Sequence, residues 1–338
     1  MAPLLEVDDL HVHFFTRDGV VKAVDGVSFT LEPGRTLGMV GESGSGKSVT
    51  ALSIMRLIPE PPGKVVSGDI RFKGRSVLQM SEKEQRDMRG NRIAMIFQDP
   101  MTSLNPVYRI GKQIGEPLRL HKNMTGKESV AAAAELLGRV GIPRPKERVR
   151  DYPHEFSGGM RQRAMIAMAL ACGPDILIAD EPTTALDVTI QAQILELMQE
   201  IQARTESAIM MITHDLGVVA DMADNVLVMY AGKAVEYGPA DEVFYRPLHP
   251  YAWGLLESLP RHDVDDKGKL CPIKGQPPSL INLPSGCSFS PRCAYAQDIC
   301  RSQAPPLAEI DPGHSSACHF SADKQFIAQS PRCAMEGR

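Results

Sequence analysis

The sequence contains no apolar run that approaches the roughly 18–20 residues needed to span a bilayer. Its N-terminal residues include acidic side chains where a secretory signal peptide would carry positive charge and then an apolar core. The formal net charge of −4 and the lack of an extended Lys/Arg face argue against a nucleic-acid binder. Internal repeats and low-complexity tracts are also absent. These absences predict a cytosolic globular chain, and its 338 residues allow one large and one smaller domain.

Cysteine is nearly absent before the last quarter of the sequence. Cys172 stands alone among apolar residues and is expected to pack in the core. Further on, Cys287, Cys293, Cys300 and Cys318 form a compact set with 5, 6 and 17 residues between successive members. Because disulfides are disfavoured in a reducing cytosol, this set indicates metal or redox chemistry. Cys271 and Cys333 fall outside the set, and His314 and His319 are less favoured ligands.

The spacing of these four cysteines leaves the bound group open. Four thiolates suit either Zn²⁺ or an iron–sulfur cluster. Neither the paired C-x-x-C of zinc ribbons nor the C-x2-C-x2-C of bacterial ferredoxins is present, so reduced thiols without a metal are a third reading. A metal would explain how a segment of about 50 residues with few large apolar side chains stays folded.

The most specific motif is the P-loop pattern G-x-x-x-x-G-K-[ST], which residues 41–48 fit in full. An apolar strand predicted over 36–40 leads into it, and a helix predicted over 49–55 leads out. Successive backbone N–H groups can then point into one concavity at the positive end of a helix, where phosphates bind. We expect Lys47 to reach the β- and γ-phosphates and the Ser48 hydroxyl to hold Mg²⁺. The predicted nucleotide-binding residues of this segment are Gly41, Ser43, Gly44, Ser45, Gly46, Lys47, Ser48 and Val49.

Polar residues end three other apolar strands, and the parallel-sheet rule brings those strand ends to one edge. One strand ends in Asp180, expected in the Mg²⁺ shell beside Ser48, and is followed by Glu181. A carboxylate next to the γ-phosphate can polarise the attacking water. His214 and Gln98 follow the other two strands and are expected at the same rim. The predicted catalytic group is therefore Glu181, His214 and Gln98.

A second glycine-rich element begins another predicted helix. Ser157, Gly158 and Gly159 open this helix and form an anion-binding element, although a plain helix cap is the alternative. One chain cannot easily bring two helix N-termini to the same phosphate. We therefore expect two chains, each of which donates one of them.

The remaining patterns divide the chain into segments. The first ~35 residues alternate apolar and polar side chains, which predicts antiparallel strands with turns at Asp18-Gly19 and Asp25-Gly26. A helical pattern follows from about residue 101 to 169, and alternating strands and helices then imply a mainly parallel sheet covered on both faces. Near residue 250 the composition becomes rich in Pro, Cys and polar residues, which indicates a linker and a small appended domain.

The motifs occur in the order and at the approximate spacing of the ATP-binding subunits of ABC transporters, which the sequence resembles over roughly residues 4–245. The segments that carry this resemblance are residues 41–48, Gln98, residues 156–160 (FSGGM), 177–181, 185–187 and His214. A longer similarity to the dipeptide/oligopeptide permease branch runs through residues 98–106, residues 249–251 and the C-terminal cysteines. The family signature usually reads LSGGQ, so Phe156 and Met160 depart at its outer positions, whereas the serine and both glycines are kept.

The resemblance implies an α/β fold with a P-loop NTPase (RecA-like) core, an antiparallel β subdomain and an inserted helical subdomain at about 99–169. The ATP-binding domain would cover 1–250 and a Cys-rich, peptide-permease-type domain 251–338. Two subunits would sandwich two ATP molecules head to tail, with Ser157, Gly158 and Gly159 of one chain facing the other chain's P-loop. Phe14 would stack on adenine, with Phe15 as the fallback, and Asp187 would join the nucleotide site.

The resemblance also implies cofactors and partners. Mg²⁺ would be held by Ser48, Gln98 and Asp180, and a 4Fe-4S cluster with a structural role by Cys287, Cys293, Cys300 and Cys318. The chain would be an ATPase that powers import of di- or oligopeptides from the cytoplasmic face of the inner membrane. Its partners would be a second, paralogous ATP-binding subunit, two transmembrane permease subunits and an extracytoplasmic substrate-binding protein, with the permease contacting the surface from Gln98 to Tyr108.

Two other functions of P-loop proteins fit this sequence less well. Soluble ABC-type ATPases of translation or DNA repair usually carry two cassettes, long coiled-coil insertions and basic stretches, which this sequence lacks. A nucleotide sensor that binds without turnover has no need of Glu181 and His214. The sequence does not distinguish dipeptide, oligopeptide, glutathione or nickel as cargo, nor a homodimer from a heterodimer.

Overall fold

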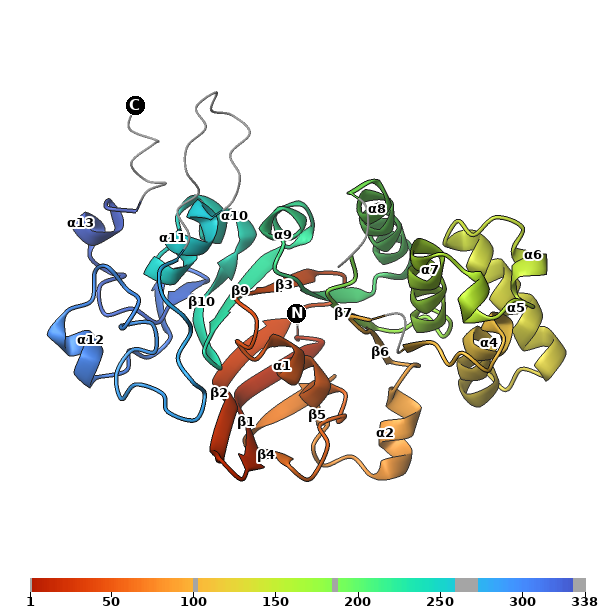
Figure 1. The fold of residues 1–338 in the computed structure, drawn as a ribbon, viewed down its shortest axis with the longest axis horizontal. Helices are drawn as coiled ribbons and strands as arrows, with labels where there is room; N and C mark the ends of the chain where they lie inside the picture. The colour runs from red at the N-terminus through yellow and green to blue at the C-terminus, as the bar shows by residue number, and fades with distance from the viewer. Residues whose placement is uncertain (1, 100–102, 184–187, 259–272, 331–338) are drawn as a thin grey trace. The chain divides into compact units, whose positions relative to one another are not determined.

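The computed structural model describes residues 2–99, 103–183, 188–258 and 273–330 (Figure 1). The predicted residues Asp187, Cys271 and Cys333 lie outside these ranges. The chain forms two compact units. The first unit comprises Met1–Leu4, Leu31–Thr36 and Val77–Ile212, and the second comprises Leu5–Thr30, Leu37–Ser76 and Thr213–Arg338. Within the described ranges, no helix combines the length and the apolar character that crossing a membrane requires.

The first unit contains parallel strands in the order β6-β7-β8. β6 (Ile93–Ile96), β7 (Ile176–Asp180) and β8 (Ala208–Ile212) are buried along their whole length. Such continuous apolar runs are typical of parallel strands with both faces covered. α8 (Val188–Thr205) follows β7, and the register Asp180↔Ile212 sets the ends of β7 and β8 side by side. The predicted parallel strands are therefore confirmed.

The rest of the first unit is helical, as predicted for residues 101–169. The helices α4, α5, α6 and α7 gather together, drawn from orange-yellow to green in Figure 1. Thr125 caps α5: its hydroxyl accepts from the Glu128 N–H, and the Glu128 carboxylate accepts from the Thr125 N–H at 2.8 Å. This capping box satisfies two backbone donors that the helix itself leaves unpaired. The elements are α2 (Glu82–Met88), α4 (Ile110–His121), α5 (Gly126–Arg139), α6 (Pro145–Arg148), η1 (Pro153–Glu155) and α7 (Gly158–Ala169).

The second unit begins with a sheet in the order β2-β1-β4-β5. Its strands are β1 (Leu5–Thr16), β2 (Gly19–Leu31), β4 (Gly63–Phe72) and β5 (Arg75–Ser76). The turn predicted at Asp18-Gly19 does join β1 to β2. The turn predicted at Asp25-Gly26 is wrong, because both residues lie inside β2. Gly26 has a φ of 85°, and the Asp25 carboxylate contacts His11 of β1 and Lys233, so the pair sits within the strand.

The second unit also holds strands in the order β11-β12-β10-β9-β3. β3 pairs with β9 in parallel, and the other neighbours pair antiparallel. β9 and β10 are absent from the sequence prediction, although β9 is a continuous apolar run. The elements are β3 (Thr36–Val40), α1 (Lys47–Ile54), α9 (Leu216–Met222), β9 (Asn225–Tyr230), β10 (Lys233–Pro239), α10 (Ala240–Tyr245), α11 (Pro250–Glu257), α12 (Asp298–Ser302), β11 (Ala308–Asp311), β12 (His314–Ser316) and α13 (Lys324–Ile327).

The segment after residue 250 packs directly on the strands that precede it. β12 pairs with β10, and Phe289 lies in one buried cluster with Val40, Tyr230 and Tyr251. The fully buried carboxylate of Glu236 on β10 is 2.8 Å from the ring Nε2 of His314 on β12 and accepts from two backbone N–H groups of residues 248 and 249. The Cys-rich segment therefore shares a core and a buried polar network with the residues around it.

Candidate functional site

The P-loop connects β3 to α1 in the second unit. Gly41 and Gly46 have φ angles of 147° and 105°, which a side chain would strain. A Cβ atom at Gly41 would also collide with the carbonyl oxygen of Met229, and one at Gly46 with that of Ala23. Gly46 is the N-terminal cap of α1, so the loop ends where the positive end of a helix begins. These two glycines are required by the backbone itself.

Lys47 holds the loop together from inside. Lys47 as a whole is 6% exposed. Its ammonium donates to the carbonyl oxygens of Gly41 at 2.7 Å and Glu42 at 2.9 Å, and to Ser45 Oγ at 3.3 Å. The loop thus curves around the lysine. Ser43 and Gly44 are exposed, whereas Ser48 is half-buried at the start of α1. The predicted P-loop residues therefore form one contiguous loop that closes around a buried lysine.

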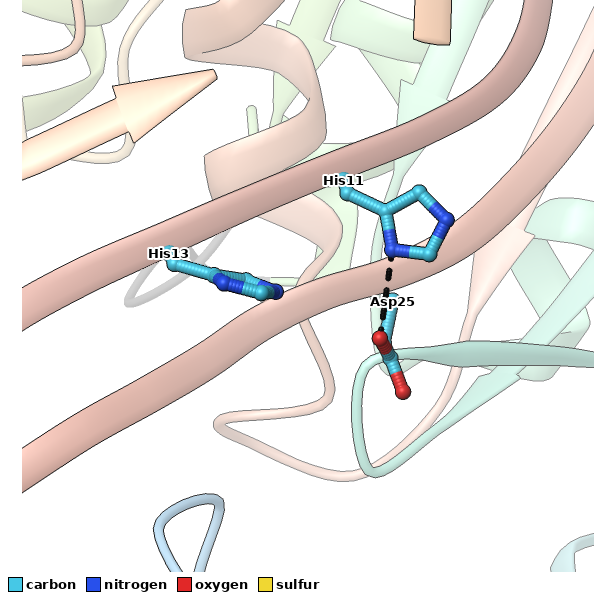
Figure 2. Close-up of side chains that lie close together, drawn as sticks. All are labelled: His11, His13 and Asp25. Atoms are coloured by element: carbon cyan, nitrogen blue, oxygen red, sulfur yellow. Dashed lines mark hydrogen bonds and ion pairs between the residues drawn. The ribbon is translucent and has the colours of Figure 1, made fainter. Parts of the chain in front are cut away.

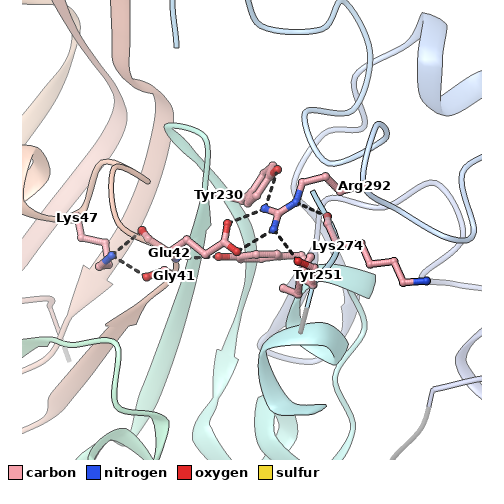
Figure 3. A network of polar contacts seen from close by, with 8 residues as sticks. Gly41, Glu42, Lys47, Tyr230, Tyr251, Lys274 and Arg292 are labelled. Carbon is pink, nitrogen blue, oxygen red and sulfur yellow. Dashed lines mark hydrogen bonds and ion pairs between the residues drawn. The ribbon is translucent and has the colours of Figure 1, made fainter. Parts of the chain in front are cut away.

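Glu42 ties this loop to the C-terminal segment (Figure 3). Arg292 donates to both carboxylate oxygens of Glu42, at 2.6 and 2.9 Å, and to the Tyr230 hydroxyl at 3.3 Å. The backbone N–H of Glu42 donates to the Tyr251 hydroxyl at 2.8 Å. The carboxylate beside Arg292 raises the pKa of the guanidinium further above its usual range, and burial raises the pKa of Tyr251. The sequence prediction missed this network because its two charged partners are 250 residues apart.

The predicted carboxylates stand at the end of β7 in the first unit. Asp180 is the last residue of β7 and is 5% exposed. Glu181 follows with a φ of 48°, which is uncommon for a residue with a side chain, and its N–H donates to Ile212 O at 2.8 Å. Gln98 Nε2 donates to the Glu181 carboxylate at 2.8 Å. The structure therefore brings together two predicted catalytic residues that are 83 positions apart.

His214 and the phenylalanines lie in the second unit. His214 is exposed just beyond the end of β8, between the buried Thr213 and the N-terminal cap of α9, Asp215. Phe14 is half-buried in β1 and pairs with Gly63 of β4, where an added Cβ would be 2.9 Å from its ring. Phe15 is 52% exposed. The predicted contacts of these side chains with a nucleotide stay predictions.

The glycine-rich signature lies at the start of α7 in the first unit. Ser157 is the N-terminal cap, and its hydroxyl accepts from the Met160 N–H at 3.3 Å. Ser157 and Gly158 are exposed, while Phe156 is buried. The phenylalanine that departs from the usual signature is thus a core residue. The exposed serine and glycine present the N-terminal end of the helix to solvent, where a ligand or a second chain can reach it.

The four predicted cysteine ligands line one cavity. Cys287, Cys293, Cys300 and Cys318 surround it together with aromatic rings that include Phe320. Among the residues the structure describes, no three of these thiol sulfurs lie within 4.8 Å of one another. A single zinc ion with Zn–S bonds of about 2.3 Å holds its sulfurs closer than that. The four thiols, as they stand, are therefore not arranged as the ligands of one tetrahedral zinc ion.

Burial disfavours the charged form of three of the cavity's thiols. Burial raises the pKa of Cys287 and of Cys318, and raises that of Cys293 to about 11. A metal would replace the protons of such buried thiols and remove the cost of burying thiolates. Of the two histidines considered as ligands, His319 lines the cavity and His314 bonds to Glu236 instead.

Another compact set of side chains joins β1 and β2 (Figure 2). Ligand atoms of His11, His13 and Asp25 lie within 4.8 Å of one another. His11 Nδ1 is 3.2 Å from Asp25 Oδ1, and its Nε2 is 3.2 Å from Asp9 Oδ1. Lys233 Nζ is 3.0 Å from the second oxygen of Asp25. Both ring nitrogens of His11 and both carboxylate oxygens of Asp25 are therefore already in contact with neighbouring side chains.

Comparison with known proteins identifies family profiles that match two parts of the chain. The ABC transporter family profile matches residues 24–184, and the profile of the oligopeptide/dipeptide transporter C-terminal region matches residues 235–300. The oligopeptide transport ATP-binding protein OppD of Bacillus subtilis is 55% identical over 311 residues, which cover 92% of this chain and 87% of that protein. OppD of Salmonella typhimurium is 54% identical over 315 residues, covering 93% of each chain.

Solved structures share the fold at lower identity. A dimeric ATP-binding cassette in a post-hydrolysis state, bound to ADP and Pi, superposes with a TM-score of 0.63 at 24% identity. The superposed region covers 70% of this chain and 98% of that cassette. The cbiO1 protein of Clostridium perfringens, part of an ABC transporter complex, has a TM-score of 0.60 at 28% identity over 72% of this chain and 91% of its own.

Proposed function

The chain belongs to the family of ATP-binding subunits of ABC transporters, in its oligopeptide/dipeptide branch, and from this premise we propose that it hydrolyses ATP to power peptide import through a membrane transporter. The observation that carries the proposal is the P-loop, whose glycines adopt the left-handed or extended backbone that a phosphate cradle needs and whose Lys47 lies buried within it. The Gln98–Glu181 pair supports turnover rather than mere binding.

The proposed chemistry divides between binding and water activation. Lys47 and the loop N–H groups bind the β- and γ-phosphates. Ser48, Asp180 and Gln98 would hold Mg²⁺, which would supply positive charge to offset the charge that develops on the phosphate oxygens. Glu181 orients the attacking water and accepts its proton, and Gln98 fixes the Glu181 carboxylate through its amide. His214, Asp187 and the adenine-stacking Phe14 complete the proposed nucleotide site.

The proposed assembly contains two ATP-binding subunits and their membrane partners. Exposed Ser157 and Gly158 at the start of α7 suit contact with the ATP of a second subunit, which we propose is a paralogue. Two permease subunits and an extracytoplasmic substrate-binding protein complete the importer, so the chain acts peripherally at the cytoplasmic face of the inner membrane. The residues from Gln98 to Tyr108 are the proposed permease contact, where Val107 is 71% and Tyr108 45% exposed.

Reconstitution tests the transport function directly. With the paralogue and both permease subunits in proteoliposomes, we expect labelled oligopeptide to accumulate only when ATP and Mg²⁺ are on the side of the ATP-binding subunits. A cysteine at Val107 should crosslink to a permease loop, whereas one at exposed Lys83 on α2 should not. ATP hydrolysis without peptide uptake in the complete complex would contradict peptide import. Uptake without any Val107 crosslink would contradict the proposed contact.

The C-terminal cavity is the proposed site of a 4Fe-4S cluster. Cys287, Cys293, Cys300 and Cys318 would hold it, and their position around one cavity that aromatic rings also line supports the proposal. Such a cluster supplies four strong Fe–S bonds to a loop-rich segment. Because ATP hydrolysis needs no redox step, we propose that the cluster is structural.

Metal analysis distinguishes the cluster from zinc. Anaerobically purified protein is expected to be brown, to absorb broadly near ~400 nm, and to contain iron with little zinc. Serine at Cys318 should remove the iron and lower the yield of assembled complex, because a ligand at the cavity is lost. Alanine at Cys172, a buried cysteine that is not among the residues lining the cavity, is the matched control and should keep the iron. Colourless anaerobic protein with stoichiometric zinc would contradict the cluster.

A further inference from the structure

Three groups of Glu42 are fixed by other side chains. Its carboxylate accepts from Arg292, its N–H donates to the Tyr251 hydroxyl, and its carbonyl accepts from Lys47 (Figure 3). Glu42 itself sits inside the P-loop, directly before the exposed Ser43 and Gly44. The second residue of the loop is thus held at its side chain, its N–H and its carbonyl oxygen. Two of the three restraints come from beyond residue 250.

Arg292 is placed to act as a rigid anchor. Its side chain is 4% exposed, against 28% for Glu42, and the paired oxygens and nitrogens form a bidentate contact. Its Nε also donates to Lys274 O at 3.0 Å, and Nη2 to Ile273 O at 3.3 Å. A planar guanidinium with this many fixed partners has one allowed orientation. A buried charge of this kind cannot lose its carboxylate partner without a large penalty.

The turn that carries Arg292 belongs to the cysteine cavity. Cys287 and Cys293 flank the turn, the Arg292 and Cys293 N–H groups donate to Phe289 O at 2.9 and 3.0 Å, and the Cys287 N–H donates to Cys300 O at 2.8 Å. The Phe289 ring lies 5.2 Å from the ring of Tyr230 and 5.4 Å from that of Tyr251, measured between centroids. The same short turn therefore contacts both tyrosines of the Glu42 network and two thiols of the cavity.

We propose that Arg292 is a positioning residue through which the C-terminal cysteine-containing segment sets the ATP affinity of the P-loop. This inference rests on the proposed ATP binding at the loop. Without the Arg292 contact, the backbone at Glu42 gains alternative conformations. Apparent affinity then falls in proportion to the population of the loop that can bind phosphate. The C-terminal segment thereby acts on nucleotide binding and leaves the hydrolytic step at Glu181 unchanged.

Nucleotide titration of the full-length chain tests the proposal. Arg292→Ala is expected to weaken ATP binding about tenfold, with KM raised and kcat at saturating ATP nearly unchanged. Arg292→Lys keeps the charge but loses the bidentate geometry, so its ATP affinity should lie between those of the wild type and Arg292→Ala. Arg301→Ala is the matched control, because Arg301 lies in the same segment in an exposed pair with Asp298 and should bind ATP as the wild type does.

A double-mutant cycle shows whether the two charges act as a pair. Glu42→Gln with Arg292→Met should bind ATP no more weakly than Arg292→Met alone, and exchanging the charges (Glu42→Arg with Arg292→Glu) should restore part of the affinity. Effects of the two substitutions that simply multiply would overturn the proposal, as would wild-type affinity in a folded Arg292→Ala variant. Failure of the wild-type chain itself to bind ATP would instead overturn the proposed function.

The cysteine segment should act through the same arginine. Cys293→Ser is expected to weaken ATP binding in the wild-type background and to add nothing in the Arg292→Ala background. Thermal unfolding of each variant, followed by circular dichroism, identifies any chain that has failed to fold. If Cys293→Ser lowered the ATP affinity equally in the wild-type and Arg292→Ala backgrounds, the proposed link between the cavity and the loop would be overturned.

Discussion

Glutamine in place of Glu181 is expected to reduce ATP hydrolysis by about 10²- to 10⁴-fold while ATP binding is retained. The substitution removes the charge that polarises water but keeps a polar side chain of the same size. The contact with Gln98 can persist, because an amide oxygen accepts a hydrogen bond as the carboxylate does now at 2.8 Å. Binding without turnover should trap a closed, ATP-bound pair of subunits in the assembled complex.

Phosphate release from the assembled complex measures turnover, and a fluorescent ATP analogue measures binding. Glu200→Gln is the matched control, because Glu200 is exposed on α8 and should leave both quantities unchanged. Near-normal phosphate release by Glu181→Gln would dismiss the assignment of Glu181. Loss of nucleotide binding in a folded variant would show that Glu181 acts in the ground state instead.

Alanine in place of Lys47 is expected to weaken ATP binding itself, by roughly 100-fold. The ammonium is the buried positive charge of the loop, and its phosphate contact exists before any bond breaks. Its loss also leaves the carbonyl oxygens of Gly41 and Glu42, which now accept at 2.7 and 2.9 Å, without that donor. Both effects act on the nucleotide-free and ground states, so affinity falls together with turnover.

Isothermal titration with ATP and Mg²⁺ separates this result from that of Glu181→Gln. Lys83→Ala provides the control, since Lys83 is an exposed lysine on α2 and its loss should not change affinity. Wild-type affinity in Lys47→Ala would show that the P-loop assignment is wrong. Lys47→Arg keeps the positive charge but replaces the compact ammonium with a planar guanidinium, so it should recover little of the ATP affinity that Lys47→Ala loses.

Local pattern predicted the elements around the P-loop well. The predicted strand over 36–40 coincides with β3, and the predicted strand over 208–212 coincides with β8. The helix predicted from 49 begins two residues earlier, at Lys47. Both strands are short runs buried along their whole length, so their signal is contained within a few neighbouring residues. The pairing of Gln98 with Glu181 followed from the rule that parallel strands end at one edge.

Contacts between distant residues were beyond the sequence patterns. Asp25-Gly26 has the composition of a turn, yet His11 and Lys233 hold the aspartate within β2. Arg292 appears in the sequence as one more charged residue in a polar, proline-rich segment. The segment meets the P-loop through the packing of Phe289 on Tyr230 and Tyr251 and through the Arg292–Glu42 contact. Neither partner carries a local signal, because an ion pair has no periodicity and no preferred spacing along the chain.

The pairing of β12 with β10 has a further consequence for how the chain is protected. β10 lies between β9 and β12, so removing the last strands would leave it as an open sheet edge with unpaired N–H and C=O groups. The same cut would uncover Glu236, whose carboxyl group is now enclosed with His314. An open strand edge beside a newly exposed carboxyl group promotes association between copies of the chain. Proteolysis between residues 258 and 308 should therefore cause aggregation, rather than release a stable shorter ATPase.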